Sequence, residues 1–296
     1  MNLIVDGNNI AVRCWKSMPV LTTTSGKHVS TIFGVIKTLR SSIESFNPDS
    51  VLMTWDDTPR ARRALFPEYK EKRKEAREEF TPDEQEDYRQ FNRQCDELRE
   101  VLSLFGLHQY YGKDVEADDL ISELSKKDKT IILSEDKDFI QLISDKVKLY
   151  RPITQALYTL KNFEELTKLP NPAMYLQARL IMGDKSDEIP GVPGFKEGRT
   201  IPLIMEHKTA WEALNAAKSM PGKLMQTLAS SEEILARNTL LMDLKYSSEY
   251  LPKSLDSYRH EGDFNEKRIK AAVLKLEFYS YMNNLVKFVA PFKDLK

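Results

Sequence analysis

Short apolar or β-branched runs alternate with amphipathic stretches through the first two thirds of the chain. Such runs predict strands, and apolar positions three or four residues apart predict helices. This alternation is typical of an α/β fold with a mostly parallel central sheet flanked by helices. The expected strands are Leu3–Val5, Val51–Trp55 and Thr130–Leu133, with weaker candidates at Leu107–Tyr111 and Val147–Tyr150; the expected helices are Thr31–Phe46, Glu116–Ser125 and Phe139–Ile143.

The alternation breaks between residues 60 and 105, where the chain is highly charged and has few apolar positions before Phe91. We expect an insertion that leaves the sheet. Pro82 suits a helix start, so a helix should run from about Asp83, and the part before it is either helical or disordered without a ligand. From Arg60 to Arg77 eight Lys or Arg face three Asp or Glu, which fits either a solvated helix face or a nucleic-acid contact.

Beyond Pro170 the strand signal fades and helical periodicity takes over. We therefore expect an α/β core at residues 1–170, with the insertion at about 60–105, and a helical region at 171–296 in the same compact unit. Residues 250–265 look like a polar connector. The helices expected in this region are Ala173–Met182, Trp211–Ala217, Glu232–Met242 and Glu266–Leu276.

Bulk composition narrows the class of protein. The 296 residues are 41% hydrophobic and 30% charged with a net charge of -1, which predicts a soluble globular protein and gives no global nucleic-acid signal. No apolar run is long enough for a bilayer, and the N-terminus lacks a secretory pattern. Cys14 and Cys95 have no metal-site spacing, so we expect reduced thiols and a cytoplasmic location, in a host cell if the source is a bacteriophage.

Aspartates follow the three strongest strand candidates almost at once. These are Asp6, Asp56 and Asp136. In open α/β sheets the ligand site lies outside the carboxyl ends of the strands, so we expect the three side chains to converge there.

Further carboxylates stand at a helix start and in two loops: Glu116, Asp118, Asp119, Asp138, Asp184 and Asp187. Any one pair is more often a cap or a solvated loop, but the conjunction is not explained by solubility. Two carboxylates ~5 Å apart repel by about 3 kcal/mol at an effective dielectric of 20, so the cluster requires divalent metal. Oxygen-only ligands favour Mg²⁺ or Mn²⁺. Two ions about 3.5–4 Å apart can activate water for phosphodiester displacement, and the four isolated histidines offer no alternative nucleophile.

Six strings occur in a fixed order along the chain: Val5–Asn8, Trp55–Asp56, Phe66–Lys70 with Arg73, Val115–Asp119, Ser134–Phe139, and Ile181–Asp187 followed by Pro190–Gly194. Together they resemble the 5′ nuclease superfamily, which comprises flap endonucleases, bacteriophage 5′-3′ exonucleases and the 5′ nuclease domain of bacterial DNA polymerase I. A further match at Ser231–Asn238 extends the resemblance to about Leu244.

The resemblance implies roles for individual residues. Asp6, Asp56, Glu116, Asp118 and Asp136 would surround one metal ion, Asp138, Asp184 and Asp187 would lie nearer a second, and Asp119 would assist directly or through water. Asp136 would be essential for catalysis. Lys70 and Arg73, at the base of a helical arch, would reach the scissile phosphate. Arg62 would contact the same strand, and Tyr69 would either stack on a base or pack at the arch base.

The family's DNA-binding helix–three-turn–helix corresponds to Gly191, Val192, Gly194, Lys196 and Arg199. Relatives grip duplex backbone there through amides and often a monovalent cation such as K⁺, but Lys196 stands where a glycine is usual. Either its side chain blocks the close backbone approach, or Lys196 and Arg199 reach phosphates as cations.

The function expected from these residues is a stand-alone, Mg²⁺-dependent 5′-3′ exonuclease and flap endonuclease, with Mn²⁺ able to substitute. Its partner would be DNA with a free 5′ end, a 5′ flap or a branched duplex, bound by a monomer without membrane contact. Two alternatives stay open. One is a PIN-type ribonuclease, which explains neither the basic insertion nor the Gly-Val-Pro-Gly segment, and the other is a catalytically inactive DNA-binding replication accessory protein.

Overall fold

The computed structural model describes residues 1–246, 249, 251–252 and 254–295. Its centre is a seven-stranded sheet in the order β6-β5-β4-β1-β2-β3-β9. The five inner strands are parallel, and the short edge strands β6 and β9 pair antiparallel with their neighbours. The strands are β1 (Asn2–Asp6), β2 (Ser50–Thr54), β3 (His108–Tyr110), β4 (Thr130–Leu133), β5 (Val147–Arg151), β6 (Ala156–Tyr158) and β9 (Arg259–His260).

Both faces of the sheet are covered, because side chains alternate between the faces along each strand. In β1, Leu3 and Val5 pack into one apolar cluster and Ile4 into another, and all three are fully buried. Burial on both faces explains why the strands read as continuous apolar runs in the sequence.

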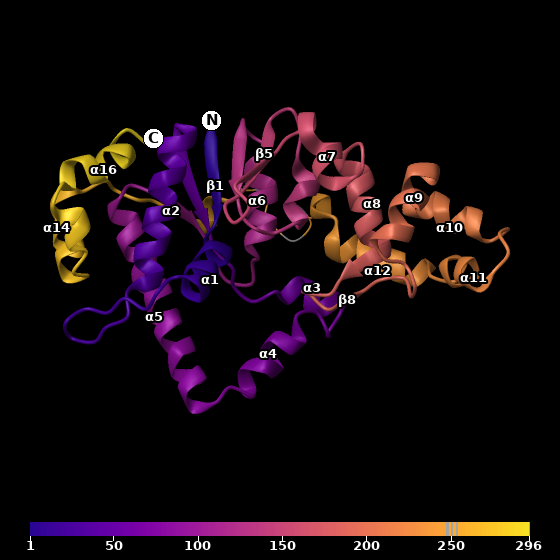
Figure 1. Cartoon of the computed structure of the whole chain (residues 1–296), viewed down its shortest axis with the longest axis horizontal. Coiled ribbons are helices and arrows are strands. Elements are labelled where there is room, and N and C mark those ends of the chain that lie inside the picture. Colours follow the sequence, from indigo (N-terminus) through magenta and orange to yellow (C-terminus); the bar gives the residue numbers. More distant parts are fainter. Residues whose placement is uncertain (247–248, 250, 253, 296) are drawn as a thin grey trace.

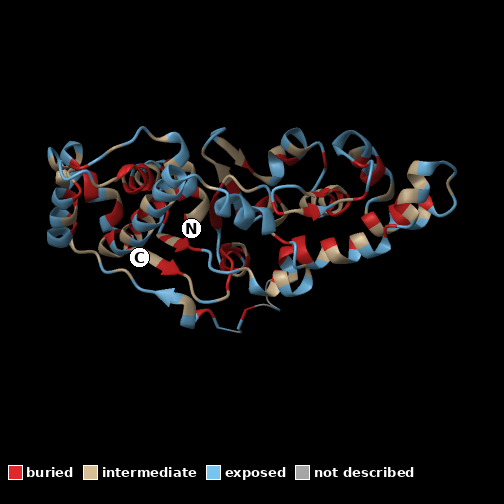
Figure 2. Cartoon of the chain, turned by 90° about the horizontal axis from the view of Figure 1, so that it is seen from below, coloured by how far each residue is buried: buried red, intermediate tan, exposed pale blue. Residues whose placement is uncertain are grey.

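One set of helices covers the face of Leu3, and a second set covers the face of Ile4. Figure 2 shows the buried residues on the strands and on the inner sides of these helices. The first set is α1 (Gly7–Ser17), α2 (Ser30–Phe46), α5 (Pro82–Leu104), α14 (Glu266–Lys275), α15 (Tyr279–Met282) and α16 (Leu285–Lys293). The second set is α6 (Ala117–Ser125), η1 (Asp138–Leu142), η2 (Leu160–Asn162), α7 (Phe163–Thr167), η3 (Leu244–Tyr246) and η4 (Asp256–Tyr258).

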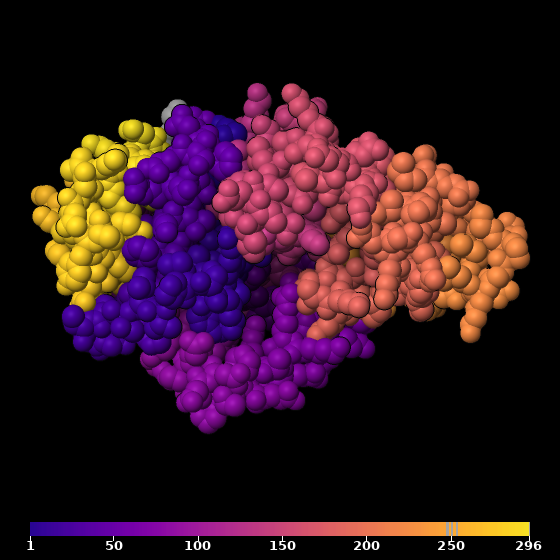
Figure 3. All heavy atoms as spheres, viewed as in Figure 1, coloured from indigo at the N-terminus to yellow at the C-terminus, as the bar shows by residue number. Residues whose placement is uncertain are grey.

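The insertion forms an arch that projects from the body of the protein (Figures 1 and 3). It consists of α3 (Arg60–Leu65), α4 (Glu71–Glu78) and the first turns of α5. Thr81 and Glu84 form a reciprocal capping box at the start of α5, with Pro82 in the first turn. These signals end the turn at the tip of the arch and begin the return arm.

A third apolar cluster lies in the helical region at one end of the molecule. The last helices α14 and α16 lie at the other end, against α2 and α5, as Figure 1 shows. The helical region comprises α8 (Pro172–Met182), the hairpin β7 (Gly183–Asp184) and β8 (Ile189–Pro190), α9 (Glu197–His207), α10 (Ala210–Ala217), α11 (Lys223–Ala229) and α12 (Glu232–Met242).

The structure confirms the predicted fold class, the expected strands and the helix after Pro82. The ranges expected from the sequence did not include the helices α1, α7, α9, α11, α15 and α16 or the short strands β6, β7, β8 and β9. The edge strands are two or three residues long and exist only through pairing with a neighbour, so local pattern does not mark them. The expected helix Phe139–Ile143 is instead the 3₁₀ segment η1. The predicted connector at 250–265 contains β9, and positions 250 and 253 lie outside the described residues.

No helix among the described residues combines the length and apolarity needed to cross a bilayer.

Candidate active site

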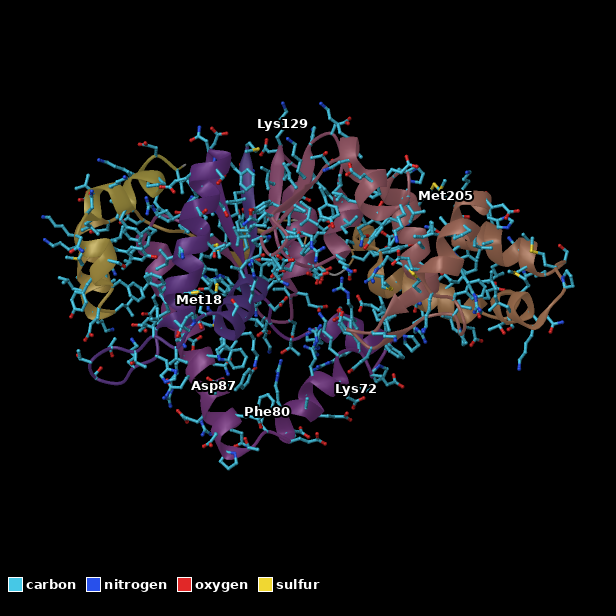
Figure 4. The ribbon with its side chains drawn as sticks, in the orientation of Figure 1. Met18, Lys72, Phe80, Asp87, Lys129 and Met205 are labelled. Carbon is cyan, nitrogen blue, oxygen red and sulfur yellow. The ribbon has the colours of Figure 1, made fainter. Side chains whose placement is uncertain are left out.

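The carboxyl ends of the parallel strands face the arch. Lys129, which precedes β4, lies at the opposite end of the molecule from Phe80 at the tip of the arch (Figure 4). Asp6 ends β1 in register with Thr54, which ends β2, and Asp56 follows two residues later. Asp136 follows β4 after a short turn. The topology therefore brings these three aspartates to one edge of the sheet, as predicted.

Asp6 is buried and doubly used. It caps α1 by accepting from the Asn9 amide at 3.1 Å, and its other oxygen accepts from the Ser134 hydroxyl at 2.8 Å. Burial, together with the negative charges of Asp56 and Asp136, raises the pKa of Asp6 to about 7. A carboxylate in this position is not neutralised by the protein alone, which is the condition that favours a bound cation.

A second group of carboxylates surrounds Arg179 of α8. The guanidinium donates to Asp138 at 2.7 Å and to Asp184, which the β7–β8 hairpin presents. Burial and the charge of Asp136 raise the pKa of Asp138 to about 7, although the charge of Arg179 acts to lower it. Burial acts to raise the pKa of Asp184, but hydrogen bonds from Ser186 and the charge of Arg179 lower it.

Asp118 belongs to the first of these groups. Burial first, and then repulsion from Asp136, raise the pKa of Asp118 well above its ordinary value, with smaller contributions from Asp56 and Asp6 and an opposing effect of Lys70. Asp136 couples the two groups, because burial and the charges of Asp187 and Asp184 raise the pKa of Asp136, and the charge of Asp136 raises that of Asp138.

Cations from the arch base occupy the other carboxylates. Lys70, in a left-handed backbone conformation at the start of α4, donates to Glu116 at 2.8 Å and lies 3.6 Å from Asp187. Arg73 donates to Asp187 and to the Ser186 carbonyl at 3.2 Å. Burial acts to raise the pKa of Glu116, but the charges of Arg62 and Lys70 lower it.

Two residues predicted to contact DNA are buried instead. Arg62 is 3% exposed and donates to Glu116 and Asp119, and Tyr69 is 2% exposed with its hydroxyl 3.2 Å from Glu116 and from Asp187. The predicted contact of Arg62 with the DNA strand is therefore corrected, whereas Tyr69 takes the second of its two predicted places and packs at the arch base. The reason is tertiary: the arch base folds back onto α6, and the carboxylates there attract the nearest cation and hydroxyl.

A cavity of about 410 Å³ separates the acidic edge from the arch. Figure 3 shows the corresponding recess between the arch and the body. Carboxylates line one side of it and arch cations the other; the lining residues are Asn8, Asp56, Asp57, Pro59, Arg63, Lys70, Arg73, Lys74, Arg77, Tyr88 and Glu116. Asp56 and Glu116 thus share one cavity with Lys70 and Arg73.

The predicted DNA-binding turn connects α8 to α9. A Cβ at Gly191 would lie 2.1 Å from the Met182 carbonyl oxygen, so only glycine fits there. The Val192 side chain is 2% exposed and its amide donates to the Ile181 carbonyl, which corrects the prediction that Val192 meets DNA.

Gly194, Lys196 and Arg199 are exposed, whereas Phe195 between them is buried. Gly194 has φ +87, and Arg199 donates to its carbonyl at 2.8 Å. Lys196 has φ -115, a value that any side chain tolerates, so lysine in place of glycine does not strain the backbone. Contact of Gly191, Gly194, Lys196 and Arg199 with DNA remains a prediction.

Among the described residues, no three His, Cys, Asp or Glu side chains are already grouped to hold a metal ion. Several of the carboxylate oxygens are hydrogen-bonded to Arg62, Lys70, Arg73 and Arg179. The donor set nevertheless fits a hard divalent cation, because it contains only oxygen and includes aspartates whose pKa is raised by burial first and by mutual repulsion second.

Sequence reasoning missed Arg179 and the short polar side chains that hold the acidic edge in place. Asn8 accepts from the Asp56 amide at 3.1 Å, and Asn9 accepts from the Glu135 amide at 3.0 Å. Ser134 accepts from the Asp136 amide at 3.0 Å. Arg179 could have been found as the one cation in the last turn of α8, directly before the Asp184 loop.

Residues 1–168 match the family model described as the 5′-3′ exonuclease, N-terminal resolvase-like domain. The chain belongs to the 5′-3′ exonuclease family. It is 27% identical to DNA polymerase I of Bacillus subtilis over 293 residues, which is 96% of the chain and 32% of that protein. It is 29% identical to the thermostable DNA polymerase I of Thermus aquaticus over 290 residues, again 32% of that protein. The chain thus spans about a third of the length of these relatives.

Solved structures agree with the family. The bacteriophage T5 flap endonuclease, in a pseudo-enzyme–product complex with DNA and metal ions, is 26% identical with a TM-score of 0.75 over 87% of this chain and 96% of that one. Flap endonuclease-1 from Methanococcus jannaschii, at 18% identity and a TM-score of 0.60 over 98% of this chain and 91% of that one, shares the fold. Both solved structures therefore share the fold of this chain.

Proposed function

We propose that the chain is a divalent-metal-dependent 5′ nuclease that hydrolyses DNA phosphodiester bonds, both as a 5′-3′ exonuclease and as a flap endonuclease. The observation that carries this proposal is the meeting of strand-end carboxylates with the cations of the arch base across one cavity. The family and the metal- and DNA-bound phage relative support it.

The carboxylates are assigned to two Mg²⁺ ions, which when bound would supply an activated water and stabilise the oxygens of the displaced strand. Mn²⁺ should substitute, since it accepts the same ligands. The first ion is assigned to Asp6, Asp56, Glu116, Asp118 and Asp136, and the second to Asp138, Asp184 and Asp187.

Asp119 is assigned a supporting role, because both of its oxygens accept hydrogen bonds from Arg62.

Lys70 and Arg73 are assigned to the scissile phosphate. Both line the cavity, and each forms an ion pair with a carboxylate assigned to a metal ion, Lys70 with Glu116 and Arg73 with Asp187. When divalent cations neutralise Glu116 and Asp187, the two arch cations lose their partners and can turn to an anionic substrate. There they would stabilise the negative charge that develops on the phosphoryl oxygens.

The DNA would lie along the acidic edge with its free 5′ end beneath the arch, where Lys74 and Arg77 also line the cavity. Gly194, Lys196 and Arg199 are assigned to duplex backbone; K⁺ binding at this turn remains a subsidiary proposal. We propose that a monomer suffices, since the acidic and basic residues of the site come from one chain.

The test is cleavage of a 5′-labelled DNA flap duplex and its single-stranded control with Mg²⁺, with Mn²⁺ and with a chelator. Asp136→Asn is compared with Asp145→Asn, which removes an exposed aspartate outside the site. We expect metal-dependent release of short 5′ products from the wild type and from Asp145→Asn, and none from Asp136→Asn.

Two other outcomes would reject the proposal. Binding without cleavage in either metal would identify a DNA-binding accessory protein. Cleavage confined to an RNA strand of the same design would identify a ribonuclease.

A further inference from the structure

Arg62 is the most deeply buried cation of the arch base. It belongs to α3, and its side chain is 3% exposed. Nη1 donates to Glu116 Oε2 at 2.5 Å and to Asp119 Oδ2 at 2.9 Å, and Nη2 donates to Asp119 Oδ1 at 2.7 Å. The guanidinium therefore grips Asp119 with two parallel hydrogen bonds and reaches Glu116 with a third, a geometry that a lysine ammonium does not reproduce.

This arrangement divides the two carboxylates by availability. Both oxygens of Asp119 accept from Arg62, the side chain is 4% exposed, and Asp119 is not among the residues that line the cavity. Glu116 does line the cavity; Arg62 holds it through Oε2, and its Oε1 accepts from Lys70 and Tyr69 on the arch side. Asp119 thus anchors Arg62, and Arg62 fixes the orientation of Glu116.

The same guanidinium ties the site to the helical region. Its Nε donates at 3.1 Å to the carbonyl of Leu241, near the end of α12. Figure 1 shows α3 close to α12. One side chain therefore connects the arch base, the start of α6 and the last turn of α12.

The burial of these charged groups lowers the stability of the fold unless their hydrogen bonds offset the lost hydration. Removing two carboxylates and a guanidinium from water costs free energy, which their attraction offsets only when the hydrogen-bond geometry is near ideal. Apolar residues of similar volume often give an equally stable protein. The geometry is near ideal here, and the oxygen it orients belongs to a carboxylate assigned to the metal.

We propose that Arg62 and Asp119 form a positioning pair that aims Glu116 at the first divalent ion, with Asp119 acting through Arg62 and not as a metal ligand. The proposal rests on the proposed function, in that Glu116 is taken as a ligand. Partners that orient a metal ligand typically change metal affinity by about ten- to a hundredfold when removed.

The test is a double-mutant cycle read out by Mn²⁺ titration of the full chain, with single-turnover cleavage of the flap duplex and DNA affinity measured in parallel. Arg62→Lys and Asp119→Asn should each lower the affinity for Mn²⁺ by about ten- to a hundredfold. The double variant should bind Mn²⁺ as tightly as the single variant with the lower affinity. At saturating Mn²⁺ the single-turnover cleavage rates of the two single variants should recover. A defect in DNA binding would not be relieved by added metal.

Ser122→Ala is the matched control, because Ser122 also ties buried α6 to a backbone carbonyl, that of Leu244 at 2.9 Å, away from the carboxylates. It should lose stability without losing Mn²⁺ affinity. If Ser122→Ala lowers the affinity for Mn²⁺ as much as Arg62→Lys and Asp119→Asn do, the effect is merely structural and the proposal is overturned.

A second cycle covers the case in which Arg62→Lys does not fold. In a Glu116→Gln background, Asp119→Asn should have no further effect on Mn²⁺ affinity. Additive losses in either cycle would make Asp119 an independent ligand and overturn the proposal. If the wild type binds Mn²⁺ but cleaves no DNA, the nuclease function is rejected, and the two cycles still test the positioning pair. If the wild type binds no Mn²⁺, both the nuclease function and the positioning pair are rejected.

Discussion

The two sides of the central cavity are built in opposite ways. On the sheet side, Asp6 ends a buried parallel strand, caps α1 and accepts from Ser134, so the backbone and side chain are fixed from several directions. On the arch side, no residue of α4 is buried, and the helix is connected mainly through its ends. The return arm α5 differs again, since Phe91, Leu98 and Leu102 anchor it in the core.

The difference separates two kinds of chemistry. Metal ligands must hold a fixed geometry, which strand ends and capped helix starts provide. Cations that meet a passing phosphate need charge and reach more than fixed positions, and a helix that buries nothing can supply both. Lys70 and Arg73 lie at the junction, where the cations of the arch contact the carboxylates of the site.

The largest effect on the sheet side is expected from the loss of a carboxylate assigned to a metal ion. Asp136→Asn should lower single-turnover cleavage by at least about a thousandfold, because a group required in the transition state is removed. The free energy of unfolding of the metal-free protein should stay the same or rise, since Asp136 contributes repulsion to Asp118 and Asp138. Rapid-quench kinetics and chemical denaturation measure the two effects, and equal activity would remove Asp136 from the site.

The anchored arm should show its dependence on packing. Phe91 is 7% exposed and its ring stacks on that of Trp15 with centroids 4.6 Å apart. Phe91→Ala should lower the free energy of unfolding by about 3 kcal/mol, through lost burial and a residual cavity. Urea denaturation monitored by tryptophan fluorescence measures it; a loss well under 1 kcal/mol would mean that α5 is not anchored through this residue.

The junction is sharpened by Lys70→Ala. Lys70 lies over the Tyr69 ring and on Glu116, within the proposed reach of the scissile phosphate. We expect single-turnover cleavage to fall by about a hundredfold with little change in DNA affinity, because the charge acts mainly in the transition state. Lys72→Ala, on the exposed side of α4, is the control. A fall in affinity that matches the fall in rate would make Lys70 a binding residue only.

The smallest effect should be that of Ala76→Gly in α4. Glycine weakens a helix interior by about 1 kcal/mol, but global unfolding should change by less than about 0.5 kcal/mol because α4 is not part of the core. Amide hydrogen exchange within Glu71–Glu78 should quicken by about fivefold, the factor that 1 kcal/mol represents. A global loss near 1 kcal/mol would show that the arm is as integrated as α5.

Most of the fold was predictable because its signals are local. The strands β1, β2 and β4 are buried on both faces and read as apolar runs, and Thr81, Pro82 and Glu84 mark the start of α5. What escaped prediction depends on partners elsewhere in the chain. Strand β9 forms only by pairing with β3, and α14 and α16 are placed by the apolar surface of α2 and α5.

The candidate site divides along the same line. The aspartates after β1, β2 and β4 could be expected to meet because parallel strands present their carboxyl ends at one edge. No local rule shows which cation turns inward. For that reason the sequence placed Arg62 on DNA, left two places open for Tyr69, and did not indicate Arg179.

The sequence by itself determined the order of the strands' apolar runs, the acidic residues that follow them and the family to which they belong, because these depend on residue type and spacing. Only the tertiary structure decided which carboxylates each cation occupies. Pairing of buried charges depends on distance and desolvation between segments such as Arg62 and Asp119, which lie 57 positions apart in the chain and within 2.7 Å in space.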